Sequence, residues 1–300
     1  MKNVAVIGSG TMGNGIAHTF ALYGFDVMLI DVDIAALEKA LQTISRNMDK
    51  QISKEVITEN DKNIALQRIK TSSLLTDISP ETALVIEAAT ENKAIKLDIF
   101  KHLSSICNAD TILASNTSSI SITEIAAATK HPQNVVGMHF MNPVPLMKLV
   151  EVIRGKETSN AVTAQIMQIS RQLEKSPVEV NDAPGFVANR IIMPMINEAI
   201  YTLAEGVSGV VEIDTVMKLG MAHPMGPLQL ADFIGLDTCY SIMNVLHMGF
   251  GAQKYAPATL LANMVQAGYL GVKSGEGFYK YTPGSKDLVV SDRFKSKQWG

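Results

Sequence analysis

The N-terminal part of the chain alternates short apolar runs with segments in which apolar residues recur at a helical period. The first pattern is typical of buried strands, and the second of helices that cover a sheet. Their alternation predicts an α/β domain of the Rossmann type with a mostly parallel sheet. We expect its strands at Asn3–Ile7, Phe25–Ile30, Leu84–Ala88, Ile112–Ala114, Val135–Met138, Leu149–Ile153 and Pro177–Val180.

Strand patterns stop at Asn181–Gly185, which carries the Pro/Gly punctuation expected between domains. Beyond it we expect an all-α domain with helices at Phe186–Ala204, Ile213–Leu219, Leu228–Leu246 and Ala258–Ala267. The predicted domains are therefore residues 1–183 for the α/β domain and 184–283 for the helical domain. Residues 284–300 are predicted to form a polar C-terminal tail.

Residues 34–68 keep a helical period for longer than one crossover helix needs. We therefore expect a helical hairpin inserted in the α/β domain, with its bend near Ile52–Thr58 and its helical pattern continuing to Ile69. The first arm carries the cations Arg46, Lys50 and Lys54. Such a row is usually a solvated helix face, which the pattern favours. The alternative is that it holds the phosphates of an extended anionic substrate.

The chain has 300 residues, of which 47% are hydrophobic and 18% charged, and a net charge of −3. This balance excludes a global attraction to nucleic acid or to an anionic membrane, and no apolar run is long enough to span one. The first apolar run ends at Gly8 and is predicted to be a strand and not a signal peptide. Cys107 and Cys239 lack a metal-ligand spacing and indicate a reducing compartment. We therefore expect a cytoplasmic protein without a metal site.

A glycine-rich segment follows the first predicted strand and opens the first predicted helix, and Asp31 stands at the tip of the next strand. Glycines there let the backbone approach a pyrophosphate, and the helix N-terminus favours its negative charge. An acid at the strand tip can accept hydrogen bonds from a ribose diol and repels a 2′-phosphate, so NAD is favoured over NADP. The predicted cofactor contacts are Gly8, Ser9, Gly10, Thr11, Met12, Gly13 and Asp31.

A second candidate site centres on His139, which ends an apolar run, and Glu151, which lies inside the next one. A turn with two prolines joins the runs, so two antiparallel strands could bring the histidine and the carboxylate together. Such a pair can act as an acid/base, although a satisfied polar pair is the simpler alternative. The polar loops Thr90–Asn92 and Ser115–Ser119 are expected at the same sheet edge, which favours catalysis. The simpler alternative for the second loop is ordinary helix N-capping, which Ser119 or Ser121 could perform while Ser118 does chemistry.

Together these motifs resemble the L-3-hydroxyacyl-CoA dehydrogenase family, most of all its short, single-function bacterial members. The resemblance runs in order and with family-like spacing from Lys2 to Tyr281. It rests on Gly8–Gly13 with Asp31, Ala88–Asn92, Ser115–Ser119, Gly137–Pro145, Asp182–Arg190, Pro224–Pro227 and Gly275–Tyr279.

The resemblance implies roles for four catalytic residues. His139 matches the family's catalytic base, and Glu151 matches its carboxylate partner. Ser118 matches the serine that bonds the reacting substrate oxygen and touches the nicotinamide side of the cofactor. Asn189 matches the asparagine of the helical domain that completes the site.

The resemblance implies further ligand contacts. NAD contacts are implied at Glu91, Lys96, Ser118 and Asn142. Contacts to the coenzyme A part of the substrate are implied at Asn47, Lys54 and Ser118, with Lys50 as a neighbour. The hairpin that carries the lysines is the part of the chain least like the family.

The implied reaction is the NAD-dependent oxidation of a short-chain 3-hydroxyacyl-CoA and its reverse, in fatty acid or butanoate metabolism. The expected pair is (S)-3-hydroxybutyryl-CoA and acetoacetyl-CoA, and a 3-hydroxyadipyl thioester of aromatic degradation is the alternative. A β-hydroxyacid dehydrogenase acting on a free acid is disfavoured, because those enzymes generally use a lysine where this chain has Asn189. A silent NAD-binding relative has no chemical need to keep all four catalytic residues. The implied assembly is a homodimer formed through the helical domain.

Overall fold

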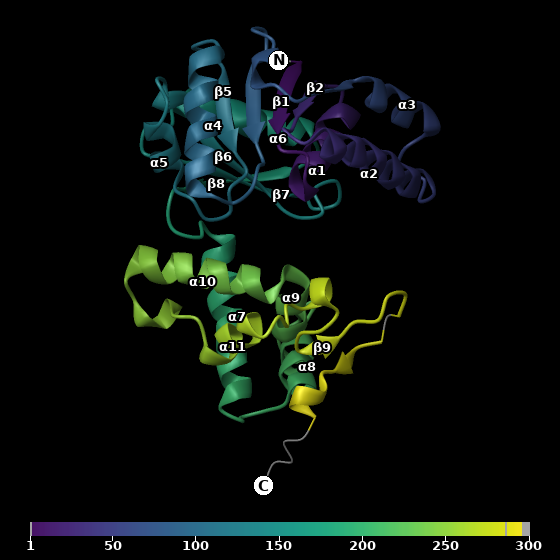
Figure 1. The fold of residues 1–300 in the computed structure, drawn as a ribbon, viewed down its shortest axis with the longest axis vertical. Helices are drawn as coiled ribbons and strands as arrows, with labels where there is room; N and C mark the ends of the chain where they lie inside the picture. Colours follow the sequence, from purple (N-terminus) through teal and green to yellow (C-terminus); the bar gives the residue numbers. More distant parts are fainter. Residues whose placement is uncertain (1, 286, 296–300) are drawn as a thin grey trace. The chain divides into compact units, whose positions relative to one another are not determined.

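The computed structural model describes residues 2–285 and 287–295. The chain divides after Ala183 into two compact units, the second beginning at Pro184. The first unit combines a sheet with helices and the second is mostly helical (Figure 1), as the sequence predicts. Within the described residues, no helix has both the length and the apolar character needed to cross a membrane.

The first unit is built on an eight-stranded sheet with the order β3-β2-β1-β4-β5-β6-β7-β8. Strands β1 to β6 pair in parallel, β7 runs antiparallel to β6, and β8 runs parallel to β7. Every predicted strand is present, and β3 is additional. The strands are β1 Asn3–Ile7, β2 Asp26–Ile30, β3 Ile69–Ser72, β4 Leu84–Glu87, β5 Ile112–Ser115, β6 Val135–Phe140, β7 Leu149–Arg154 and β8 Ser176–Asn181.

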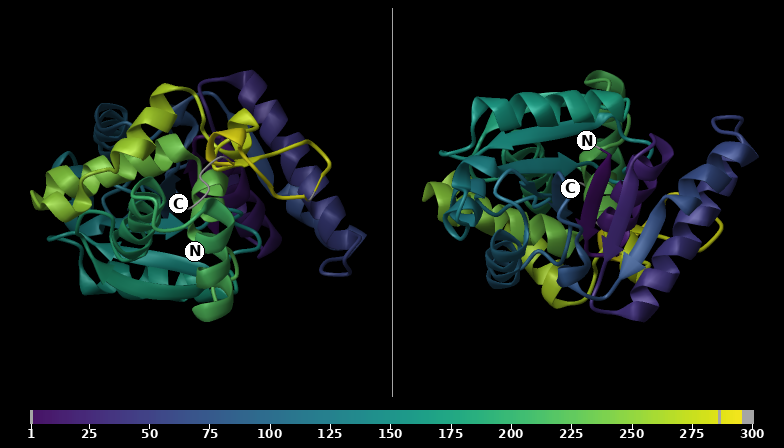
Figure 2. Two further views of the ribbon diagram at one scale, coloured as in Figure 1. Left: turned by 90° about the horizontal axis from the view of Figure 1, so that it is seen from below. Right: turned by 90° about the horizontal axis from the view of Figure 1, so that it is seen from above.

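Helices lie on both sides of this sheet (Figure 2). Helix α1 packs on it through Ile16 and Phe20, which are fully buried. A polar side chain caps the N-terminus of each of the other five helices, for example Asn92 at α4 and Ser121 at α5. The helices are α1 Thr11–Leu22, α2 Ile34–Ile52, α3 Glu59–Gln67, α4 Lys93–Ile106, α5 Ile122–Ala127 and α6 Asn160–Gln172.

Helices α2 and α3 form the predicted hairpin, and residues 53–58 join them. The expected continuation of the helical pattern to Ile69 is wrong, because α3 ends at Gln67 and Ile69 begins β3. Arg68 marks the change, since its carbonyl accepts a hydrogen bond from Val27 N at 2.9 Å. Pairing with the edge of the sheet therefore overrides an apolar spacing that also fits a helix.

The second unit contains five helices within its described residues. The single helix predicted over Leu228–Leu246 is wrong, because the chain breaks at Gly235, whose φ is +101°. Leu236 N turns away to donate to Leu270 O at 3.2 Å. Only glycine adopts such a φ readily, so the break is built into the sequence. The helices are α7 Ala188–Ala204, α8 Val210–Gly220, α9 Pro227–Ile234, α10 Leu236–Phe250 and α11 Thr259–Gln266.

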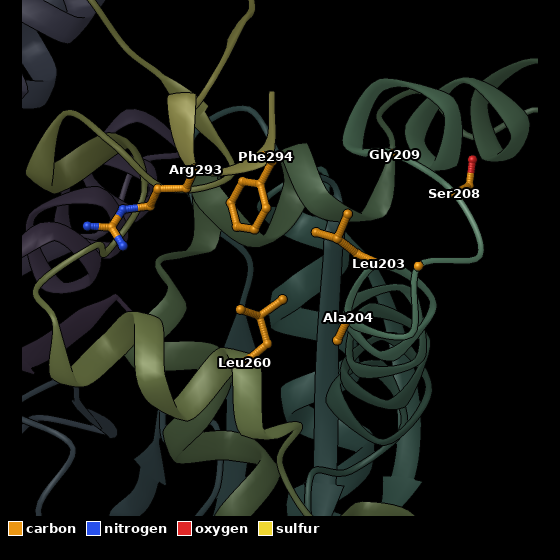
Figure 3. A pocket seen from close by; sticks show the side chains of 8 residues that line it. Leu203, Ala204, Ser208, Gly209, Leu260, Arg293 and Phe294 are labelled. Carbon is orange, nitrogen blue, oxygen red and sulfur yellow. The ribbon is translucent and has the colours of Figure 1, made fainter. Parts of the chain in front are cut away.

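The C-terminal segment differs from the predicted polar tail. Strand β10, Val289–Val290, pairs antiparallel with β9, Tyr279–Lys280. Phe294 packs against Phe278 with ring centroids 5.7 Å apart and, with Arg293, lines a pocket of about 300 Å³ in the helical unit (Figure 3). These few apolar residues are too short a run to give a periodic signal. Residue 286 and residues 296–300 of the predicted tail lie outside the described residues.

Candidate active site

The antiparallel pairing of β6 and β7 sets His139 opposite Glu151 in register. Their side chains meet, with His139 Nδ1 lying 2.8 Å from Glu151 Oε2. Both are buried, at 6% and 2% exposure. The strand–turn–strand pattern therefore brings the histidine and the carboxylate together as expected from the sequence.

Ser118 reaches the other side of the imidazole from the loop after β5. Its Oγ lies 3.0 Å from His139 Nε2. A carboxylate can only accept, so the bond to Glu151 assigns the ring proton to Nδ1. Nε2 of the neutral imidazole is then an acceptor that faces a hydroxyl, which is the position a general base requires.

Glu91, in the loop after β4, organises the segment that carries Ser118. Its Oε1 accepts hydrogen bonds from Thr117 Oγ1 at 2.6 Å, Ser118 N at 2.9 Å and Ser119 Oγ at 2.8 Å. Burial alone would raise the pKa of the Glu91 carboxyl. The Lys96 ammonium and these hydrogen bonds outweigh it and hold the pKa below its usual range. The Glu91 carboxylate is thus available as a fixed anion at neutral pH.

Lys96 lies in α4 and is only 1% exposed. Its ammonium contacts Glu87 Oε1 at 2.6 Å and Glu91 Oε2 at 3.4 Å. Glu87 in turn accepts the Ser115 hydroxyl at 2.7 Å. Glu87 is not among the residues predicted from the sequence, although an acid inside the apolar run that forms β4 is a signal for it. This burial favours a positioning role for Lys96 over the direct NAD contact that the resemblance implies.

The glycine-rich loop fits a pyrophosphate. A Cβ on Gly13 would lie 1.7 Å from Gly8 O, so the loop and helix α1 approach as only glycine permits. Gly8 has a φ of +95°, and a Cβ there would lie 2.6 Å from Ala88 O. A Cβ on Gly10 would meet no described atom within 4 Å, so the space beside the loop is open. This is the arrangement that lets a phosphate reach a helix N-terminus.

Asp31 lies directly after β2 and closes the loop from the side. Its Oδ2 accepts Ser9 N at 2.7 Å and Ser9 Oγ at 2.8 Å. Burial acts to raise the pKa of Asp31, but the hydrogen bonds from Ser9 and from Asp33 N lower it below its usual value. A carboxylate keeps acceptor capacity beyond these bonds, so Asp31 can also accept from a ribose hydroxyl.

One pocket of about 380 Å³ joins the cofactor loop to the hairpin. Ser9, Gly10 and Thr11 line it together with Asn142 of the β6–β7 connection and Asn47 of α2. Predicted NAD contacts and one predicted coenzyme A contact therefore share a cavity. Lys39 and Thr43 of α2 line the same pocket and are not among the residues predicted from the sequence.

The remaining predicted residues are not brought into that pocket. Lys50 lies in the last turn of α2 and Lys54 in the bend after it, and both are exposed. Met12 is in the first turn of α1. Asn189 is a buried residue at the start of α7, in the second unit.

Family models match nearly the whole chain. The model described as 3-hydroxyacyl-CoA dehydrogenase, NAD binding domain, matches residues 3–183. The model described as 3-hydroxyacyl-CoA dehydrogenase, C-terminal domain, matches residues 185–281.

Individual relatives agree with these models. The chain is 54% identical to a probable 3-hydroxybutyryl-CoA dehydrogenase of Bacillus subtilis over 94% of this chain and 98% of the relative. It is 50% identical to the 3-hydroxybutyryl-CoA dehydrogenase of Clostridioides difficile over 93% and 99%. Its fold is similar to the crystal structure of (S)-3-hydroxybutyryl-CoA dehydrogenase PaaH1 from Ralstonia eutropha. That match has a TM-score of 0.91 and 50% identity over 94% of this chain and 99% of the other.

These matches confirm the resemblance that the motifs carry, together with the NAD-binding character of the first unit. The chain belongs to the 3-hydroxyacyl-CoA dehydrogenase family.

Proposed function

We propose that this protein interconverts (S)-3-hydroxybutyryl-CoA and acetoacetyl-CoA with NAD. The observation that carries the proposal is the continuous hydrogen-bonded chain Ser118–His139–Glu151 beside a glycine loop that fits a pyrophosphate. Relatives at 50–54% identity are named as 3-hydroxybutyryl-CoA dehydrogenases, which supports the same reaction.

His139 is the acid/base in this proposal. Nε2 accepts the proton of the substrate's 3-hydroxyl, and the Glu151 carboxylate stabilises the imidazolium that forms. Ser118 Oγ, 3.0 Å from Nε2, holds the substrate oxygen, and Asn189 is kept as a predicted second contact to that oxygen. Bound NAD supplies the acceptor for the hydride from C3. In the reverse direction His139 returns the proton to the 3-oxo group.

Residues of the first unit support the choice of cofactor and the contacts to the coenzyme A part of the substrate. Asp31 disfavours the 2′-phosphate of NADP by charge, so NAD is the proposed cofactor. Asn47, which lines the pocket beside the cofactor loop, is proposed to contact coenzyme A, and the exposed Lys50 and Lys54 to attract its phosphates.

Assembly and location are proposed on separate observations. The helical unit exposes large apolar side chains, among them Ile191, Leu219 and Met248 at 66%, 81% and 76% exposure. We propose that they take part in a homodimer formed through this unit. Cys107 and Cys239 are free thiols, which supports a reducing, cytoplasmic location.

The test is NADH oxidation with acetoacetyl-CoA, with free acetoacetate and with 3-oxoadipyl-CoA, each repeated with NADPH. We expect fast turnover of acetoacetyl-CoA with NADH only. Turnover of the free acid would move the protein to the β-hydroxyacid branch, and a preference for 3-oxoadipyl-CoA would favour aromatic degradation. Tight NADH binding without turnover of any substrate would contradict the proposed reaction.

A further inference from the structure

Lys175, between α6 and β8, is a buried cation outside the catalytic chain. Only 7% of it is exposed. Its ammonium donates to two backbone carbonyls of the β6–β7 connection, Val144 O at 2.6 Å and Met147 O at 2.9 Å. One side chain thus ties together both ends of a turn that lies far from it in sequence.

Nothing in the described part of the chain gives this ammonium a carboxylate within 4.0 Å. Burying an ammonium is costly unless its donors are satisfied, and here the two carbonyls accept two of its three N–H donors. The charged or titratable groups around it are His18 of α1, Lys148 at the foot of β7, the adjacent Glu174 and Tyr23. The Glu174 carboxylate is bound elsewhere, by Tyr23 OH at 2.9 Å and by Lys148 at 3.9 Å.

The β6–β7 connection that Lys175 holds forms one wall of the pocket of about 380 Å³ beside the glycine loop, which we call the cofactor pocket. Asn142, Pro143, Val144 and Pro145 line that pocket together with Ser9, Gly10 and Thr11 of the glycine loop. Val144 is 2% exposed and presses on α1, because a Cβ on Gly15 would lie 3.0 Å from Val144 Cβ. The position of this wall relative to the glycine loop therefore depends on the turn that Lys175 fixes.

We propose that Lys175 is a positioning residue that holds the Asn142–Met147 turn against α1 and so sets the width of the NAD pocket. The inference rests on the NAD-binding role of the first unit and deepens the proposed function. It assigns Lys175 to cofactor affinity and not to the chemical step, because its ammonium contacts only the backbone of the wall.

The charge on Lys175 gives the proposal a second readout. Burial, and then the positive charge of Lys148, lower the pKa of the Lys175 ammonium to about 8. Charge-assisted hydrogen bonds are stronger than neutral ones. The two hydrogen bonds from Lys175 to the turn should therefore weaken as the pH rises through that value. Replacing Lys148 by Met removes a repelling charge and should move this transition to higher pH.

The experiment measures NADH binding by fluorescence without acyl-CoA between pH 7 and 9, in the wild type, Lys175→Met and Lys148→Met. Lys175→Met removes both charge-assisted hydrogen bonds to the turn and should weaken NADH binding at pH 7 by at least about tenfold, the value expected for the loss of one such bond. Lys148→Met, the same change at an exposed lysine, should bind as the wild type at pH 7. With saturating NADH, Lys175→Met should keep kcat within about threefold, well under one tenfold step in barrier height.

Wild-type affinity at pH 7 in a folded Lys175→Met would overturn the proposal. If Lys175→Met does not fold, the pH dependence of NADH binding in the wild type and in Lys148→Met tests the proposal. An affinity that does not change through pH 8 in the wild type, or a transition that Lys148→Met leaves in place, would equally overturn it. Because binding is measured without thioester, a failure of the proposed reaction leaves this test intact.

Discussion

Glu91 Oε1 lies 2.9 Å from the backbone nitrogen of Ser118. An acid on the loop after β4 therefore fixes the serine on the loop after β5. Lys96 holds the other oxygen of the same carboxylate at 3.4 Å from within α4. The orientation of Ser118 toward His139 therefore depends on the Glu91 carboxylate and on Lys96 as much as on its own loop.

Glu91→Ala should lower kcat by about 10²-fold, since a reacting group displaced by about 1 Å loses rate on that scale. The measurement is kcat with saturating acetoacetyl-CoA and NADH. Glu124→Ala is a suitable control, because Glu124 is an exposed acid paired with Lys93 on the surface. An unchanged kcat in Glu91→Ala would show that Ser118 keeps its position without the carboxylate.

His139→Gln should lower turnover by about 10²- to 10⁴-fold, the usual contribution of a general acid–base. NADH affinity should change little, because His139 contacts Ser118 and Glu151 and does not line the cofactor pocket. Turnover and NADH binding are measured in parallel, with the exposed His102→Gln as the matched control. Near-normal turnover would remove His139 from the role of base.

Asp31→Ser should shift cofactor preference toward NADPH, because it replaces the carboxylate that accepts from the ribose diol with a neutral hydroxyl and removes the charge that repels a 2′-phosphate. The ratio of kcat/KM for NADH and NADPH measures this preference. Asp31 also binds Ser9 N and Oγ, so NADH affinity should fall in the same variant. A preference ratio equal to that of the wild type would mean that Asp31 does not contact the ribose.

His18 should make the fold acid-sensitive. It is fully buried in α1, and burial is the main reason that its pKa falls from 6.5 to about 4. A group with a lowered folded-state pKa takes up its proton mainly on unfolding, so stability should fall as the pH drops from 6.5 toward 4. The full effect is about 3 kcal/mol, at 1.36 kcal/mol for each pKa unit.

Urea unfolding of the wild type, His18→Gln and His102→Gln across that pH window tests this prediction. His18→Gln should flatten the pH dependence, and His102→Gln, a change at an exposed histidine, should not. Equal slopes in all three proteins would assign the acid sensitivity to other groups.

Local patterns were enough to predict the centre of the site. The register of one hairpin brings His139 to Glu151, and the shared edge of parallel strands brings Ser118 to the same place. Both relationships follow from the period of a strand and from the direction of its neighbours. They need no knowledge of distant side chains.

The supporting charges could not be predicted in this way. Glu87 and Lys96 meet across two elements, and Lys175 reaches a turn 28 positions away at Met147. Their contacts depend on how the elements pack on the sheet in three dimensions. The local spacing of apolar residues carries no information about that packing. The break at Gly235 was missed for a related reason, since its glycine disrupts a pattern that is apolar on both sides.

In the proposed mechanism, the direct opposition of His139 and Glu151 makes the acid/base pair depend on strand register. Side chains alternate between the faces of a sheet, so a slip of one residue in β7 would turn Glu151 to the opposite face. The glycine loop lies on another part of the sheet, so the first loss would fall on the histidine–carboxylate pair. During evolution, an insertion between β6 and β7 is therefore tolerable only if the turn changes its length and the register of the two strands is kept. A shift of β7 by a single residue would silence the enzyme without altering any catalytic residue.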